Sequence, residues 1–144
     1  IIPNGTMDST KGENMTNRFD NWTPPEIKHG EMTKWLWVVF RPENLTLGRK
    51  TDIGAFTSIF AHHGVEIGDD VQIGSHCSIY SLNTEDNTSG KVRIGKGAMI
   101  GTHSSIMPGV TIGEGAIIGA YSFVKQDIPA GALAYGIPAK VVSK

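Results

Sequence analysis

The sequence has a single cysteine, few leucines and no long apolar run. One cysteine cannot form an internal disulfide, which predicts a reducing, cytoplasmic setting. No apolar run approaches the roughly 20 residues that a membrane-spanning helix needs. The 5 leucines stand against 16 isoleucines and 9 valines, so the composition favours strands and excludes a helix bundle.

Neither sign of charge dominates, and no phosphate-binding motif is present. The 13 basic and 14 acidic residues leave a net charge of −1, which argues against a nucleic-acid-binding surface because such a surface needs a basic stripe. Gly95 and Gly97 begin a possible dinucleotide-binding motif, but Ile100 stands where its third glycine would be. Phosphate-loop and dinucleotide-binding folds are therefore excluded.

Glycine is abundant, with 18 in 144 residues, and most glycines follow a repeat. Aliphatic residues recur six positions apart, with two longer gaps, at Leu47, Ile53, Ile59, Ile67, Ile73, Ile79, Ile94, Ile100, Ile106, Ile112, Ile118 and Val124. The next position is glycine in eight of these twelve units. The four exceptions fall at every third unit, at Phe60, Tyr80, Met107 and Lys125. A second period of 18 therefore lies over the period of six.

Small residues reinforce this repeat. Four positions after the aliphatic, nine of the twelve units have a small side chain, for example Thr51, Cys77 and Ser122. A period of six with three units per turn predicts a triangular coil, in which the aliphatic fills the interior and the small residue permits the corner. One unit buries little alone, so stability must come from stacking. We expect an all-β solenoid with four full coils, over residues 47–66, 67–93, 94–111 and 112–129.

Over residues 45–144 this pattern resembles the hexapeptide-repeat acyltransferase family, whose fold is a left-handed parallel β-helix. Residues 119–124, 127–129 and 136–141 also resemble the closing segment of that family. The resemblance implies an acetyl-CoA-dependent acetyltransferase that acts on a sugar or nucleotide-linked sugar in surface-glycan biosynthesis. It also implies a homotrimer. From the composition and the histidine spacing we expect no nucleic-acid or membrane partner and no metal.

The chain divides into an irregular segment, residues 1–34, and a β-helix domain, residues 35–144. Residues 35–40 form a short apolar run that predicts a strand, with Trp35 and Trp37 on one face. The two tryptophans either form a lid over the open end of the solenoid or give a sugar ring an aromatic platform. Trp37 is therefore one candidate acceptor-binding residue.

The first longer gap of the repeat contains the candidate catalytic base. His63 falls at a small-residue position, where a bulky ring does not belong, and we place the two extra residues directly after it. Residues 63–68 resemble a His-x-Cys-x-Ile-Gly stretch of nucleotide-sugar N-acetyltransferases, with Val65 replacing the cysteine. The resemblance implies that His63 is the general base, with His62 as the alternative, and histidine titrates near operating pH. Glu66 and Asp52 are candidates for orienting it.

The second longer gap is a polar loop, residues 81–90. Its side chains, with Asn83 as the candidate, suit a hydroxyl-rich acceptor. Galactoside and maltose acetyltransferases of this family keep their catalytic histidine in a loop at this coil edge, and this loop has none. We therefore expect the base to lie in the first gap.

Two further histidines occupy equivalent positions in different coils. His76 and His103 each follow their aliphatic by three residues, so they should stack, with Phe56 below and Tyr121 above. The stack is either a surface ladder or, at His103, one flank of the cofactor groove. His76 is kept as a candidate acceptor-binding residue.

The family resemblance also implies where acetyl-CoA binds, which is along a groove between neighbouring subunits. Thr102 and Ala120 would line this groove through their backbone groups. Lys125 and Gln126 match the donor-binding pair of the family, and Lys140 matches the basic residue of its closing segment. Lysine is a suitable partner for the phosphates of CoA because it is a point charge.

Three alternatives remain open at this stage. A catalytically inert β-helix that acts as a scaffold is consistent with the missing loop histidine. A γ-class carbonic anhydrase shares the fold, but its second-coil histidines are five residues apart, and Ala98 stands five before His103. A serine acetyltransferase would carry a long helical domain before the coils, whereas about 34 residues precede them here.

Overall fold

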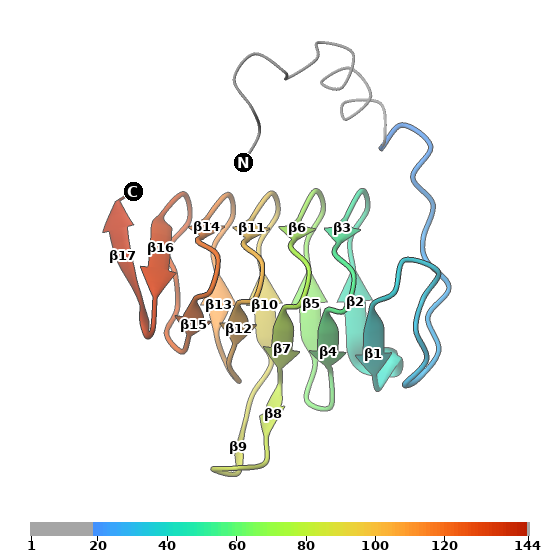
Figure 1. The fold of residues 1–144 in the computed structure, drawn as a ribbon, viewed down its shortest axis with the longest axis horizontal. Helices are drawn as coiled ribbons and strands as arrows, with labels where there is room; N and C mark the ends of the chain where they lie inside the picture. The colour runs from blue at the N-terminus through green and yellow to red at the C-terminus, as the bar shows by residue number, and fades with distance from the viewer. Residues whose placement is uncertain (1–18, 144) are drawn as a thin grey trace.

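The computed structural model describes residues 19–143, which form a triangular solenoid of parallel strands (Figure 1). Sheet A consists of β1 (Val38–Phe40), β4 (Ser58–Phe60), β7 (Ser78–Tyr80), β12 (Ser105–Ile106) and β15 (Phe123–Val124). Sheet B consists of β2 (Leu45–Leu47), β5 (Val65–Ile67), β10 (Val92–Ile94) and β13 (Thr111–Ile112). Sheet C consists of β3 (Asp52–Ile53), β6 (Gln72–Ile73), β11 (Met99–Ile100), β14 (Ile117–Ile118), β16 (Leu133–Gly136) and β17 (Ala139–Ser143).

The strands pair in the register that the repeat predicts. Each repeat aliphatic lies beside the aliphatic of the next coil, as Ile59 pairs with Ile79 in sheet A and Ile73 with Ile100 in sheet C. Most of these side chains are buried in one continuous core. The predicted fold, a left-handed parallel β-helix in the all-β class, is thereby confirmed as an all-β parallel solenoid.

The small residues of the repeat also point inward, and the polar ones among them are hydrogen-bonded. Thr57 is fully buried, and its hydroxyl donates to the carbonyl of Gly74 at 2.8 Å. Cys77 is 1 % exposed, and burial raises the pKa of its thiol. These contacts satisfy the buried polar groups, which would otherwise destabilise the core.

The four predicted coils are present, and the repeat extends beyond them at both ends. Val39 in β1 pairs with Ile59, so it is one unit ahead of Leu47, the first unit that the spacing indicated. At the other end β16 continues sheet C beside β14, and β17 pairs with it in an antiparallel hairpin. The closing segment therefore extends the stack.

The N-terminal part differs from the predicted strand over residues 35–40. Only Val38–Phe40 is a strand, because Leu36 has a left-handed φ of 66° that turns the chain. Trp37 is 3 % exposed and belongs to the core, whereas Trp35 is 45 % exposed. Within residues 19–143, no helix is long and apolar enough to cross a membrane.

Candidate active site

Each coil of the triangle has three corners. At two of them a glycine follows the repeat aliphatic, and at the third it does not. The corners are named by the sheets they join, in chain order. At the B–C and C–A corners, the residue that follows each repeat aliphatic is glycine. The backbone of the next coil packs directly against this position. A Cβ on Gly54 would lie 2.4 Å from the backbone nitrogen of Ser75, and one on Gly101 would lie equally close to that of Ala120.

At the A–B corner the same position carries larger side chains. These are Phe40, Phe60, Tyr80, Met107 and Lys125. The rings of Phe40 and Phe60 stack at 5.0 Å, and those of Phe60 and Tyr80 at 4.9 Å. This explains why glycine is missing at every third unit.

The extra residues of the repeat all lie at the A–B corner. They fall within residues 41–44, which include the 3₁₀ turn Pro42–Asn44, within residues 61–64, and within residues 81–91, and we call these three segments the insertions. The last contains a hairpin, β8 (Leu82–Asn83) and β9 (Thr88–Ser89), that projects from the solenoid (Figure 1). The repeat predicts the second and third insertions, whereas the first lies before Leu47, where the predicted repeat begins.

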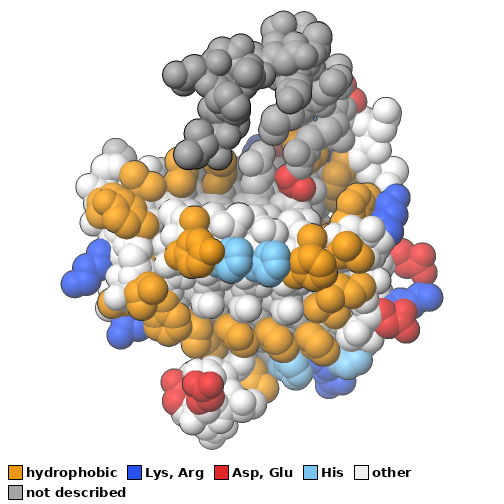
Figure 2. All heavy atoms as spheres, in the orientation of Figure 1, with side chains coloured by type: hydrophobic (Ala, Val, Ile, Leu, Met, Phe, Trp, Pro, Cys, Tyr) orange, Lys and Arg blue, Asp and Glu red, His pale blue; other side chains and the backbone are white. Residues whose placement is uncertain are grey.

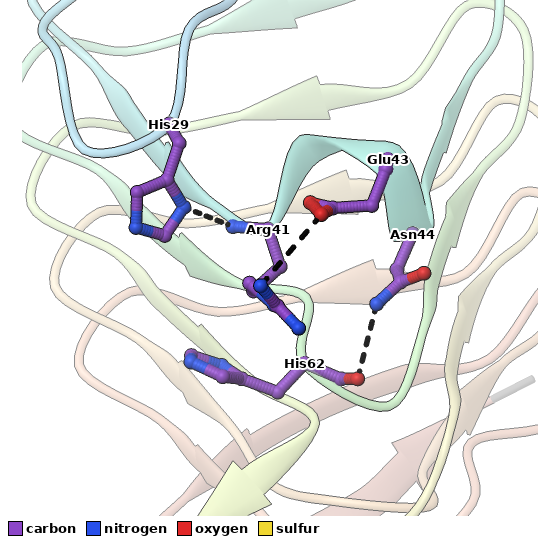
Figure 3. A network of polar contacts seen from close by, with 5 residues as sticks. All are labelled: His29, Arg41, Glu43, Asn44 and His62. Carbon is purple, nitrogen blue, oxygen red and sulfur yellow. Dashed lines mark hydrogen bonds and ion pairs between the residues drawn. The ribbon is translucent and has the colours of Figure 1, made fainter.

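Hydrogen bonds tie these insertions to one another. The Asn44 side-chain amide donates to the His62 carbonyl at 3.1 Å, so the first two insertions lie side by side (Figure 3). The backbone N–H of His63 donates to the Ser81 hydroxyl at 2.9 Å, and that hydroxyl donates to the Phe60 carbonyl at 2.6 Å. The turn that carries both candidate histidines is therefore held from both sides.

His63 does not occupy the inward small-residue position that the repeat predicts for it. Val65, which is fully buried, fills the inward small-residue position of this unit. His62 and His63 lie at the tip of the turn, and both are exposed. The extra residues thus form the turn itself and do not follow His63.

The two groups considered for orienting His63 have other surroundings. Glu66 lies in β5, where its carboxylate accepts from Lys91 Nζ at 2.9 Å and pairs with Arg93 Nε at 3.5 Å. The hydrogen bond from Lys91 lowers the pKa of Glu66. Asp52 lies in β3, on sheet C. The structure therefore gives no role in orienting His63 to either carboxylate.

A groove with a volume of about 810 Å³ opens at the A–B corner. Its wall includes the stacked rings of Phe60 and Tyr80, and the β8–β9 hairpin forms one side. The groove brings together His62, Asn83 and Lys125, which are three of the sequence-predicted site residues. His63 is next to this groove in the chain but is not among the residues that line it.

The predicted histidine ladder is confirmed, and it lies at the C–A corner, on the other edge of sheet A. The rings of His76 and His103 stack at 4.7 Å, His103 and Tyr121 stack at 4.6 Å, and Phe56 tilts against His76 at 5.2 Å. Figure 2 shows the two histidines side by side in a row with hydrophobic side chains at both ends. All four residues have left-handed φ values between 57° and 64°.

Four of the five predicted donor-binding residues are divided between the two edges of sheet A, and the fifth lies on sheet C. Thr102 and Ala120 lie at the C–A corner, beside the histidine ladder. Lys125 and Gln126 follow β15 at the A–B corner, and both are exposed. Lys140 is exposed on β17, opposite Tyr135. One chain therefore does not bring all five residues into one groove.

Metal ligands are not gathered anywhere in the part of the chain that the structure describes. No three histidine, cysteine, aspartate or glutamate side chains of residues 19–143 are grouped so that they could hold an ion. Among the described residues, the candidate site therefore consists of its histidines, a lysine and the polar loop.

Comparison with known proteins agrees with this fold. Residues 91–126 match the family model "Bacterial transferase hexapeptide (six repeats)". The chain is 33 % identical to galactoside O-acetyltransferase of Escherichia coli K12 over 108 residues, which is 69 % of this chain and 53 % of the relative. These matches confirm the resemblance to the hexapeptide-repeat acyltransferase family that the sequence pattern predicts.

Two solved structures of acyltransferases share this fold. A maltose O-acetyltransferase from Clostridium difficile 630 superposes with a TM-score of 0.68 and 29 % identity, over 75 % of this chain and 63 % of that one. AntD, an N-acyltransferase from Bacillus cereus in complex with dTDP-4-amino-4,6-dideoxyglucose and Coenzyme A, shares the fold with a TM-score of 0.65 and 23 % identity, over 78 % of each chain. The chain spans only part of the length of the curated relatives that it matches, for example 64 % of one and 47 % of another.

Proposed function

We propose that this protein transfers an acetyl group from acetyl-CoA to a hydroxyl or amino group of a sugar or nucleotide-linked sugar. The observation that carries the proposal is the A–B corner, where His62, a polar hairpin and Lys125 line one groove and His63 is the next residue in the chain. The similarity to galactoside and maltose O-acetyltransferases supports the reaction class. AntD, whose structure holds CoA, supports the donor. A place in surface-glycan biosynthesis is part of the same proposal.

In this mechanism His63, or alternatively His62, accepts the proton of the acceptor group. The acceptor oxygen or nitrogen attacks the thioester carbonyl, the C–S bond breaks, and CoA leaves as a thiolate that takes up a proton. A backbone N–H in the groove would stabilise the negative charge on the carbonyl oxygen. The exposed turn gives either imidazole access to an acceptor, and the Ser81 hydrogen bond fixes the backbone of this turn.

Asn83 is proposed to hydrogen-bond acceptor hydroxyls from the hairpin that lines the groove. Trp37 is left out of the acceptor site because its indole is 3 % exposed. His76 lies in the ladder at the other edge of sheet A, so it would reach an acceptor only through a neighbouring subunit.

A homotrimer would unite the divided donor-binding residues. In one chain Thr102 and Ala120 lie at one edge of sheet A, and Lys125 and Gln126 at the other. A neighbouring copy could set its C–A corner against the A–B corner of the first, so that one groove would contain both sets. In that arrangement Lys125 and Lys140 would supply positive charge for the phosphates of CoA.

A thiol-release assay with acetyl-CoA tests the activity. The acceptors are a panel of sugars, amino-sugars and nucleotide-linked sugars, and the control is the same assay without acceptor. We expect acceptor-dependent release of CoA with at least one of them. If acetyl-CoA binds and no acceptor of any class stimulates release, the inert scaffold becomes the better description. A monomeric mass at micromolar protein would contradict the trimer and the shared groove.

A further inference from the structure

All three tryptophans of the chain line one cavity, which is separate from the groove at the A–B corner. Trp22, Trp35 and Trp37 surround a volume of about 450 Å³ at the N-terminal end of the solenoid. Polar side chains at its edge include Asn21, Lys34 and Asp52. None of the residues that line this cavity lines the groove at the A–B corner.

The turns that carry the three indoles are held by hydrogen bonds. Trp22 Nε1 donates to the Thr51 carbonyl at 3.0 Å, which ties residues 19–25 to the first coil. The buried Thr33 hydroxyl accepts from the backbone N–H groups of Trp35 and Trp37 at 3.3 and 3.4 Å. The cavity is therefore formed without a ligand, and binding does not require the aromatic rings to be ordered first.

Covering the end of the core does not explain all three tryptophans. Trp37 is 3 % exposed and packs within the core, so it serves that purpose. Trp35 is 45 % exposed, and Lys34 Nζ lies 4.3 Å from the centre of its ring. A large indole left this exposed beside a cavity contributes little to the core, and such exposed aromatic surface marks binding sites.

The lining favours an uncharged, polyhydroxylated ligand. The described lining contains one cation, Lys34, and one anion, Asp52, so its formal charges cancel. A pyranose ring has an apolar C–H face that packs on an indole, and its hydroxyls match a few polar groups at the edge of an apolar site. A second depression of about 380 Å³ shares Thr23, Pro25, Lys34 and Trp35 with the first and leaves room for an adjoining ring.

We propose that this three-tryptophan cavity is a second carbohydrate-binding site, which holds a neutral sugar ring of a glycan away from the groove that His62 lines. The inference stands on the cavity itself and does not require the proposed acetyl transfer. The described groove residues include no tryptophan, and all three tryptophans of the chain line the second site, so all indole emission comes from residues of that site.

The test titrates the full chain with maltose and with N-acetylglucosamine while indole emission is recorded. At least one sugar should give a saturable change, and Trp35→Ala should weaken its affinity at least tenfold. Leu36→Ala is the matched control, because Leu36 belongs to the same turn, is 48 % exposed and does not line the cavity. Asn83→Ala, in the hairpin, should also leave the titration unchanged.

A thermal melt of each variant distinguishes lost binding from lost folding. The proposal is overturned if the emission stays flat to about 100 mM of both sugars, or if a folded Trp35→Ala binds as the parent does. A response to CoA without a response to either sugar would also overturn it. None of these outcomes depends on catalysis, so failure here leaves the proposed acetyltransferase activity untouched.

Discussion

Gly101→Ala should destabilise the solenoid strongly, although the change adds only one methyl group. The new Cβ would lie 2.4 Å from the backbone nitrogen of Ala120, whereas ordinary contacts begin at 3.4 Å. The two coils would have to separate by about 1 Å, which strains the bonds from Gly101 N–H to the Ile118 carbonyl and from Tyr121 N–H to the Thr102 carbonyl, each 2.8 Å. Overpacking costs about 1–3 kcal/mol and each lost bond about 1 kcal/mol, so we expect a loss of about 3–5 kcal/mol.

Gly97→Ala is the matched control for this prediction. Gly97 has a φ of 71°, and its added Cβ would meet nothing within 4 Å, so only the left-handed strain of about 1 kcal/mol remains. Urea unfolding of both variants at one protein concentration measures the difference. If Gly97→Ala is as destabilising as Gly101→Ala, the close approach of successive coils is not what selects glycine at these corners.

Three further predictions concern single side chains. His63→Ala should lower turnover by about 10²- to 10⁴-fold with acetyl-CoA binding unchanged, while His62→Ala should cost less; the opposite order would identify His62 as the base. Lys140→Glu should weaken CoA binding at low salt, and the deficit should shrink as salt screens the charges; equal binding would remove Lys140 from the donor site. Cys77 should resist alkylation in the folded protein and react once urea unfolds it, because burial raises the pKa of its thiol; rapid labelling of folded protein would contradict its buried position.

The sequence was sufficient to predict the sheets, because a solenoid repeats its packing rule in every coil. Ile59 and Ile79 occupy equivalent places in successive coils, so their spacing predicts both their burial and their pairing. His76 and His103 occupy equivalent positions in successive coils, so the repeat predicts the histidine ladder in the same way. Features that repeat with the coil can be predicted from one chain without any knowledge of its three-dimensional contacts.

The position of the insertion was wrong for a related reason. The sequence pattern places the small residue four positions after each aliphatic, which is two positions before the next aliphatic only when the spacing is six. In the longer unit the forward count ends at His63, but the buried residue is Val65, two before Ile67. The buried small residue begins the strand that carries the next aliphatic, so its position is set by that strand. Counting two positions back from the aliphatic therefore locates it even where the preceding turn is longer. The three-tryptophan cavity could not be found by spacing, since Trp22 meets Thr51 across segments that share no repeat.

The location of the extra residues follows from how the corners are packed. At the glycine corners the backbone of the next coil lies so close that even a Cβ does not fit at Gly54 or Gly101. A longer segment there would separate the coils. At the A–B corner large side chains stack along the edge, and the chain between sheets A and B can lengthen without disturbing the strands on either side. A solenoid of this kind can therefore lengthen its connections at one corner only, and that is the corner where His62, His63 and the hairpin lie.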